Sequence, residues 1–167
     1  MTRQNSVADK VNPGTGRIGH LLQATQPAVM RPHGMAVIVP VYTPGVTDNY
    51  LTETIHGFPL GAAGFFPDTC TDALRGSSVY DHDREDIRCY YGSIFLEESR
   101  VQEEYTTHEH ALFYKITFPE NPPGRIAFRA LRDSGRGIQA SCTSGDWRIH
   151  GPDLNGRAIR SVPHFCH

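Results

Sequence analysis

The residues whose types and spacing could do chemistry are concentrated in one segment, Val11–Met35. It is rich in glycine and proline and also carries histidine, arginine, asparagine and threonine. The glycines of Gly14-Thr15-Gly16 would let backbone N–H groups approach a ligand closely. An ordered, glycine-bearing loop directly before a core strand is a common place for function. From these features alone, the favoured interpretation is a structured arm lying over a sheet, and a ligand-binding loop is the alternative.

Two acidic groups could supply paired carboxylates. One is the run from Asp81 to Asp86, which contains four carboxylates, and the other is Glu103-Glu104. Such pairs can act as a general acid together with a base or nucleophile. The favoured interpretation is nevertheless a solvated surface, because charge runs are usually exposed.

Metal and redox chemistry have weaker support. His108 and His110 are two residues apart on a predicted strand and share a face, but no third ligand is fixed by spacing, so we predict no metal site. The four cysteines contain no C-x-x-C pair; they could form two disulfides with three possible connectivities, and free buried thiols are the more ordinary interpretation. The cysteines are Cys70, Cys89, Cys142 and Cys166.

Length and composition favour one folded domain of 167 residues, with 38% hydrophobic and 20% charged residues. A net charge of −2 does not suggest a nucleic-acid or membrane partner. The longest apolar run, Met35–Val41, is too short to span a bilayer. The first ten residues lack the apolar region of a signal peptide, so none is predicted.

The pattern of the chain predicts an all-β fold, an antiparallel β-sandwich with a long N-terminal loop and few short helical turns. Alternating apolar residues and turn signals, without a sustained helical stripe, support this class. Strands are predicted at Met35–Tyr42 with both faces covered, within Ile55–Phe66, and at Cys89–Leu96, Arg100–Thr107, His110–Phe118 and Arg125–Leu131. The last two alternate: Ile126 and Phe128 are expected to face inward, and His110–Phe118 is expected to place on one side Leu112, Tyr114, Ile116 and Phe118, and on the other Phe113, Lys115 and Thr117. Pro67–Ser78 is predicted as a loop and Asp81–Arg88 as at most a helical turn. We expect a flexible tail at 1–10, the sandwich at 11–150 and a poorly anchored tail at 151–167.

Two ordered motif blocks resemble glycoside hydrolase family 92, the exo-acting α-mannosidases. The first block is Val11-Asn12-Pro13, Gly14-Thr15-Gly16, Gly19-His20 and Arg31-Pro32-His33-Gly34-Met35. The second is Tyr80-Asp81-His82-Asp83, Tyr90-Tyr91, Glu103 to Thr107 and Phe118-Pro119. The chain departs from the family pattern by lacking two apolar residues between Pro13 and Gly14, and by carrying His33 where phenylalanine is usual. Both histidines of a family signature are missing at Gly57–Gly61. The resemblance covers Val11 to Leu131.

The resemblance implies an N-terminal β-sandwich domain that packs on an (α/α)6 barrel and helps to shape the sugar pocket. The catalytic carboxylates belong to that barrel, which this chain is too short to contain, so the predicted chain is a fragment that is not catalytic alone. Its implied partners are the barrel and α-mannoside glycans, and the complete enzyme is expected to use Ca²⁺, with no cofactor in this chain. The family is usually secreted or periplasmic. The alternative is a free-standing carbohydrate-binding or scaffold β-sandwich module.

Within the loop, the resemblance points to six substrate-binding residues. His20 stands out because a neutral imidazole can donate one hydrogen bond and accept another, which suits a hydroxyl-rich ligand. A surface histidine bonded to a nearby carbonyl is the alternative. The six residues are Gly14, Thr15, Gly16, His20, Arg31 and His33.

Two further expectations concern exposed surfaces. A domain built to dock on a barrel should leave an apolar patch uncovered when alone, and we expect self-association as a result. The expected patch consists of Ile18, Leu21, Leu22, Val29 and Met30. Aromatic platforms for a sugar could come from Tyr42, Tyr80, Tyr90 or Tyr91, although β-sandwich cores also use tyrosine.

Overall fold

The computed structural model describes residues 7–16, 25–43, 53–60, 63–69, 76–122, 124–130, 139–143, 146–152 and 158–161. The helices in this part of the chain are two 3-10 turns, η1 (Val7–Lys10) and η3 (His82–Arg84). No helix among these residues is long and apolar enough to cross a membrane. The strands are β1 (Val29–Met30), β2 (Val37–Ile38), β3 (Val41–Tyr42), β4 (Thr54–Leu60), β5 (Ala63–Asp68), β6 (Ser78–Val79), β7 (Asp86–Arg88), β8 (Tyr91–Leu96), β9 (Val101–Thr107), β10 (Leu112–Thr117), β11 (Arg125–Ala130), β12 (Gln139–Thr143), β13 (Asp146–Pro152) and β14 (Ala158–Ser161).

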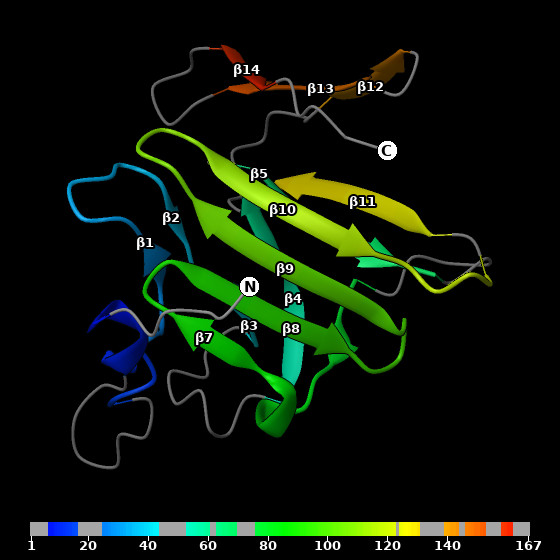
Figure 1. The fold of residues 1–167 in the computed structure, drawn as a ribbon. Coiled ribbons are helices and arrows are strands. Elements are labelled where there is room, and N and C mark those ends of the chain that lie inside the picture. Colours follow the sequence, from blue (N-terminus) through cyan, green and yellow to red (C-terminus); the bar gives the residue numbers. More distant parts are fainter. Residues whose placement is uncertain are drawn as a thin grey trace.

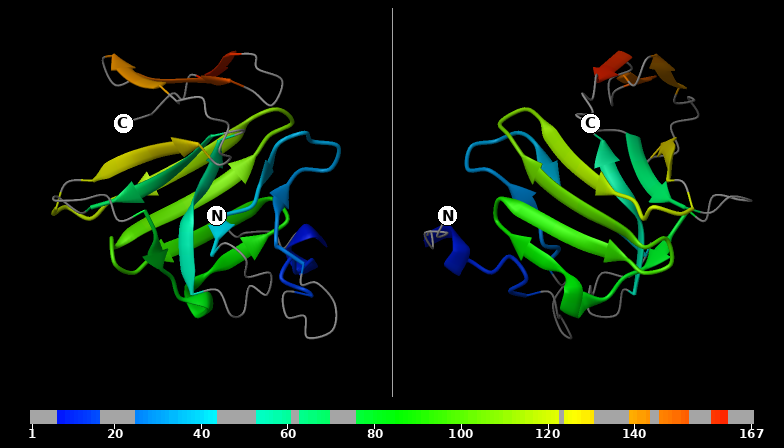
Figure 2. Two further views of the ribbon diagram at one scale, coloured as in Figure 1. Left: turned by 180° about the vertical axis from the view of Figure 1, so that it is seen from behind. Right: turned by 45° about the vertical axis from the view of Figure 1, so that its right-hand side comes forward.

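Two antiparallel sheets form the body of the fold (Figure 1). One has the strand order β10-β9-β8-β7, and the other has the order β11-β5-β4-β3 with β6 paired to β4. The views in Figure 2 show them as two facing layers. The β1-β2 hairpin lies beside β9, and β12-β13-β14 form a separate three-stranded sheet. The predicted all-β antiparallel sandwich is therefore confirmed.

Aromatic side chains join the two layers in the core. The rings of Phe65 and Tyr114 lie edge to face with centroids 4.8 Å apart, and those of Phe58 and Tyr105 are 5.9 Å apart. The Tyr114 hydroxyl donates a hydrogen bond to the carbonyl of Pro59 on the opposite sheet. Edge-to-face pairs of this kind add specific geometry to the burial of apolar area. The core therefore fixes how the two sheets lie on each other.

The alternation predicted for the later strands is confirmed. In β10 the half-buried residues are Leu112, Tyr114 and Ile116, and the exposed ones are Phe113, Lys115 and Thr117. β9 alternates as well, with every second residue buried, although no alternation was predicted for it. Ile126 and Phe128 of β11 pack against the core, as expected. Each of these strands turns one face toward the opposite sheet and one face outward.

The single strand predicted at Met35–Tyr42 is wrong in one respect, because the structure divides it into β2 and β3. The first part pairs with β1 and the second pairs with β4, so the chain passes from one sheet to another at Val39-Pro40. Proline has no N–H to donate to a ladder, which suits this point of exchange. The expectation that both faces are covered is also wrong, since Ile38 is fully buried while Val37 is 40% exposed.

Two other strand boundaries differ from the prediction. Asp86–Arg88 forms β7, which pairs with β8, whereas only a helical turn had been predicted there, and that turn is η3. β7 is too short and too charged for alternation to reveal it. β5 continues to Asp68 through Pro67, which pairs with β11 but lies beyond the register that β5 shares with β4. The missing N–H of Pro67 therefore costs no bond to β4.

The structure also bears on the predicted tails. Val7–Lys10 forms η1. Within it, the Asp9 side chain accepts hydrogen bonds from Arg88, the last residue of β7, and from Tyr90, just before β8. At the other end, β13 extends to Pro152 and β14 spans Ala158–Ser161. The division into a sandwich at 11–150 and tails at 1–10 and 151–167 stays a prediction.

Candidate functional site

The predicted glycine segment forms a tight turn. The amide of Gly14 donates to the side-chain oxygen of Asn12 at 2.8 Å, and the amide of Thr15 donates to the Asn12 carbonyl at 3.1 Å. Gly16 has φ of +85°, which suits glycine, and its carbonyl accepts from the amide of Thr25 at 2.9 Å. The amides of Gly14 and Thr15 are thus already engaged within the turn. A ligand here would meet the exposed side chain of Thr15 and the exposed backbone at Gly16.

Arg31 and His33 lie at the tip of the β1-β2 hairpin, and both side chains are exposed. The amide of Gly34 donates to the Arg31 carbonyl at 3.0 Å, and His33 has φ of 60°, a left-handed conformation that is uncommon outside glycine. The amide of Met35 donates to the Glu109 carbonyl at 2.8 Å, so the hairpin tip is fixed beside the β9–β10 turn.

The predicted binding residues do not form one cluster in the described structure. Figures 1 and 2 show the segment from Val11 to Gly16 well apart from the tip of the β1-β2 hairpin that carries Arg31 and His33. His20 lies outside the described residues. Any shared site for these six residues would have to form around a ligand or partner that spans the two regions.

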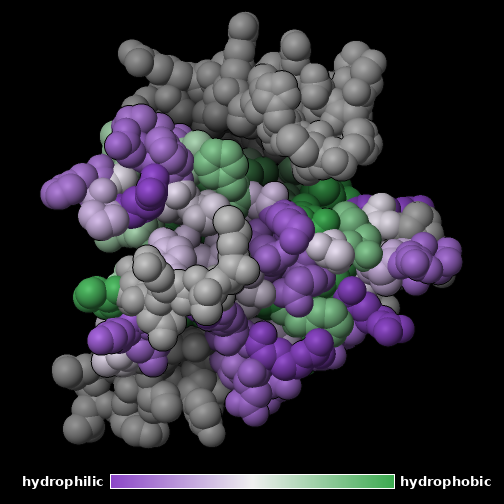
Figure 3. All heavy atoms as spheres, in the orientation of Figure 1, coloured by the Kyte–Doolittle hydropathy of each residue, from purple (hydrophilic) through white to green (hydrophobic). Residues whose placement is uncertain are grey.

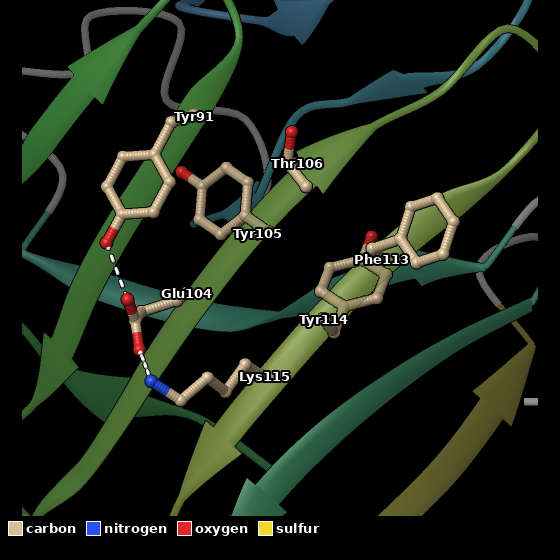
Figure 4. A pocket seen from close by; sticks show the side chains of 7 residues that line it. All are labelled: Tyr91, Glu104, Tyr105, Thr106, Phe113, Tyr114 and Lys115. Carbon is tan, nitrogen blue, oxygen red and sulfur yellow. Dashed lines mark hydrogen bonds and ion pairs between the residues drawn. The ribbon is translucent and has the colours of Figure 1, made fainter. Parts of the chain in front are cut away.

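A shallow hollow lies on the outer face of the first sheet, which we define as the face of β10-β9-β8-β7 turned away from the second sheet. Its volume is about 200 Å³. The lining residues are Tyr91, Glu104, Tyr105, Thr106, Phe113, Tyr114 and Lys115 (Figure 4). The hollow exists because Thr106 is paired with Phe113 on one side and is flanked by Tyr91 on the other. A small side chain between two aromatic ones leaves a gap in the surface.

One carboxylate organises the polar part of the hollow. The Tyr91 hydroxyl donates to one oxygen of Glu104 at 2.8 Å, and the Lys115 ammonium donates to the other oxygen at 2.6 Å. The hydrogen bond from Lys115, with that from Tyr91, lowers the pKa of Glu104, and the same carboxylate raises the pKa of Lys115. The pKa of Tyr91 is raised, mainly by burial. Glu104 and Lys115 therefore form an ionised pair near neutral pH.

The two glutamates of the predicted Glu103-Glu104 group lie on opposite faces of β9. Glu103 is fully buried, and neither of its carboxylate oxygens has a hydrogen-bond partner. Burial, and to a smaller extent the neighbouring Glu104, raises the pKa of Glu103 well above 4.5. The expectation of a solvated pair is thus wrong for Glu103, because neighbouring residues of a strand point to opposite faces.

The side chains of the acidic run Asp81–Asp86 contact groups within the run or close to it in the chain. The Asp81 side chain accepts from the amide of Asp83 at 2.9 Å and caps η3. Asp86 makes an ion pair of 3.0 Å with Arg88. Glu85 lies 3.8 Å from His82. These contacts give the run a structural role at the entry to β7.

The tyrosines proposed as sugar platforms divide between core and surface. Tyr42 and Tyr80 are 5% and 3% exposed, with ring centroids 6.0 Å apart, so they are core residues. The Tyr90 hydroxyl bonds to Asp9. Only Tyr91 lines the hollow. Sequence reasoning missed its partners there, although the alternation of β10 had already put Phe113 and Lys115 on one face.

No group of three or more His, Cys, Asp or Glu residues in the described part of the chain could hold a metal ion. The Ca²⁺ that the family resemblance implies for a complete enzyme is therefore given no ligands among the described residues. Cys89 is a free, half-buried thiol; the other cysteines fall where no side chain is described.

The expected apolar patch is only partly present. Val29 is 1% exposed because β1 packs beside β9, so its assignment to the surface is wrong, whereas Met30 is 50% exposed. Ile18, Leu21 and Leu22 lie outside the described residues. The β1-β2 hairpin exposes two further apolar side chains, Met35 at 81% and Val37 at 40%.

Comparison with known proteins finds matches among solved structures. No family model and no curated protein matches the chain. Among solved structures, a family GH92 α-mannosidase from Bacteroides thetaiotaomicron matches 90% of this chain with a TM-score of 0.71 and 20% sequence identity. A GH92 family glycosyl hydrolase matches 86% with a TM-score of 0.69 and 18% identity. The chain has the fold of a domain of these enzymes.

The match covers only part of each enzyme. The chain spans 24% of the Bacteroides thetaiotaomicron α-mannosidase and 24% of the GH92 glycosyl hydrolase. A GH92 inverting mannosidase from the same Bacteroides species is matched over 25% of its length, with a TM-score of 0.63 and 14% identity. The predicted likeness to a family 92 domain is thus confirmed at the level of the fold.

Proposed function

We propose that this chain is the N-terminal β-sandwich domain of an α-mannosidase-like glycoside hydrolase and acts together with an (α/α)6 barrel that is not part of it. The observation that carries the proposal is the fold match to about a quarter of family GH92 α-mannosidases. The two motif blocks between Val11 and Pro119 support it independently of the fold.

The placement of Glu103 and Glu104 supports a non-catalytic role for this pair of carboxylates. Glycoside hydrolysis uses two carboxyl groups that flank one bond. Glu103 and Glu104 lie on opposite faces of a strand, the first inside the core and the second bonded to Tyr91 and Lys115. They cannot flank a shared substrate. The reacting carboxylates of the complete enzyme would come from the barrel.

In this proposal the N-terminal loops help to shape the mannoside pocket at the contact with the barrel. The exposed side chains of Thr15, Arg31 and His33, the backbone of Gly16, and His20 would face the barrel or the sugar. Gly14 contributes differently, because its amide holds the turn together through Asn12. The glycine turn and the hairpin tip would then be two separate contributions, brought into one site by the barrel between them.

The test needs the barrel, supplied on the same chain or in trans. The present chain alone should not release mannose from an α-1,2-mannobioside, and the assembled protein should. Replacing Arg31 or His20 with alanine should lower mannosidase activity without changing the melting temperature, while Glu120→Ala, at an exposed loop position, serves as control. Enzyme-like turnover by the chain alone would refute the proposal. Unchanged activity of both variants would remove the loops from the sugar pocket.

The second candidate is a free-standing carbohydrate-binding module. The hollow between Tyr91 and Phe113 favours it, because aromatic walls with adjacent polar groups are suited to small polar ligands. The DNA downstream of the coding segment separates the two candidates: a continuation that encodes a helical barrel supports the enzyme domain.

A further inference from the structure

We propose that the hollow on the outer face of β8, β9 and β10 is a binding site for a single neutral pyranose ring. The residues that line it all belong to this chain, and the described loop residues Thr15, Arg31 and His33 are not among them. The inference rests on the second candidate function, carbohydrate binding, for which it names the site and the ligand class, and it does not depend on a barrel.

The register of three strands creates the shape of the site. Phe113 of β10 pairs with Thr106 of β9, and Gly92 pairs with Tyr105, which sets Tyr91 on the other side of Thr106. Two strand spacings separate the aromatic walls by about 9–10 Å along the sheet. Figure 4 shows Tyr91 and Phe113 on either side of Thr106. The space between them, about 200 Å³, suits one ring and is below the range of roughly 300–1,000 Å³ that holds a drug-sized ligand.

The aromatic walls are available for contact. Phe113 is 54% exposed although it is a large apolar side chain. On this side of the molecule, hydrophilic and hydrophobic residues are interspersed over the coloured surface (Figure 3). The C–H face of a sugar ring can cover such an aromatic side chain while its hydroxyl groups stay near polar partners. An exposed phenylalanine beside the polar side chains of Thr106 and Lys115 is thus a suitable contact for a ring with one apolar face.

The polar groups supply both donors and acceptors. An ionised carboxylate has about four acceptor positions, and Glu104 uses one on each oxygen, for Tyr91 and Lys115. The ammonium of Lys115 has three donors, of which one is used by Glu104, and its side chain is 73% exposed. Two neighbouring hydroxyl groups of a sugar could therefore bridge the pair, one donating to Glu104 and one accepting from Lys115.

The charge of the site selects the ligand class. The carboxylate and the ammonium balance each other, so an anionic or a cationic ligand would meet a like charge within the same hollow. A neutral ring with adjacent hydroxyl groups meets complementary groups only. The Thr106 hydroxyl is held by the Tyr90 carbonyl at 2.6 Å, which fixes the floor of the hollow before any ligand enters.

In the experiment, the ¹⁵N-labelled full chain is titrated separately with three glycosides, and its amide chemical shifts are recorded after each addition. The glycosides are methyl α-mannopyranoside, methyl α-glucopyranoside and methyl α-galactopyranoside. Glycerol serves as the control for a non-specific polyol. We expect saturable shifts from at least one glycoside at Tyr91, Thr106, Phe113 and Lys115, and none of that pattern with glycerol. Phe113→Ala should weaken binding about tenfold, which corresponds to about 1.4 kcal/mol, because it removes one of the two aromatic walls.

The matched control is Thr117→Ala, which lies on the exposed face of the same strand but outside the hollow. It should bind as the unmodified chain does, and both variants should keep the melting temperature. No saturable shift with any of the three glycosides, or equal binding by Phe113→Ala, would overturn the proposal. A barrel-dependent mannosidase activity bears on the proposed function only, so the two ideas fail separately.

Discussion

Substitution of Glu103 provides a sharp test of how this core is built. Its side chain is fully buried, and neither carboxylate oxygen has a hydrogen-bond partner. In the sheet it stands in one row between Ile94 and Ile116. Burial is the main cause of its raised pKa, with the charge of Glu104 as a smaller cause. The folded protein therefore keeps a proton on Glu103 where the unfolded chain has lost it.

The sign and size of the pH effect follow from this proton. Between 4.5, the ordinary pKa of the group, and its raised pKa, the folded state binds more protons than the unfolded state. The free energy of unfolding therefore falls as pH rises through this window, by up to about 1.4 kcal/mol per pH unit from this one group. Below pH 4.5 the unfolded chain also keeps this proton, so Glu103 no longer makes the free energy of unfolding depend on pH.

Two variants separate the charge from the burial. Glu103→Gln has nearly the same shape and cannot titrate, so the slope should disappear while a buried polar group remains. Glu103→Met also removes the unpaired polar atoms, and should raise the free energy of unfolding by about 1–3 kcal/mol near neutral pH. Urea denaturation at several pH values between about 5 and 8 gives both quantities from the midpoint at constant m-value.

Glu104→Gln is the matched control on the outer face of the same strand. The pKa of Glu104 is lowered by Lys115 and Tyr91, so its contribution is present above pH 4.5 and lost as pH falls through the lowered pKa. Its substitution should keep the fall in stability at higher pH, over a slightly narrower pH range, because the charge of Glu104 is the smaller cause of the raised pKa of Glu103. If the unmodified protein shows no fall in stability from about pH 5 to 8, or if Glu103→Met is less stable than it, the reasoning about the buried carboxyl is wrong.

Three further predictions concern packing and surface. Gly92→Ala would place a Cβ atom 2.2 Å from the ring of Tyr105, and thermal denaturation should show a loss of about 1–3 kcal/mol; an unchanged melting temperature would contradict this close approach. Tyr114→Phe removes the hydroxyl that bonds to the Pro59 carbonyl across the sandwich, and should cost about 1 kcal/mol in urea denaturation, whereas no loss would mean that water replaces the bond. Self-association of the chain should decrease in Met35→Ser, because this side chain is 81% exposed on the β1-β2 hairpin, and light scattering that shows a monomer before the substitution would count against the idea.

Local alternation made much of the sandwich predictable. The predicted strands that became β10 and β11 carry a side-chain pattern of period two that predicts which residues face inward, and the structure agrees. The antiparallel all-β class followed from these strands and from the turns between them. The motif blocks around Gly14–Gly16 and Tyr80–Asp83 pointed to the family whose domain has this fold.

Pairing between distant segments was beyond the reach of such patterns. The division of Met35–Tyr42 depends on β1 and β4 offering partners on either side of Pro40. The burial of Val29 depends on the packing of its short strand beside β9. β7 is a strand only because β8 lies next to it.

The sequence by itself determined the fold class and the faces of β10 and β11, because alternation is a property of consecutive residues. Only the tertiary structure decided that Tyr91, Thr106 and Phe113 form one hollow, because they become neighbours through the register of three strands. Register depends on turn geometry and on which faces pack together, and a shift of one residue would send every side chain of a strand to the other face. The same dependence placed Glu103 in the core and Glu104 in the hollow, although they are adjacent in the chain.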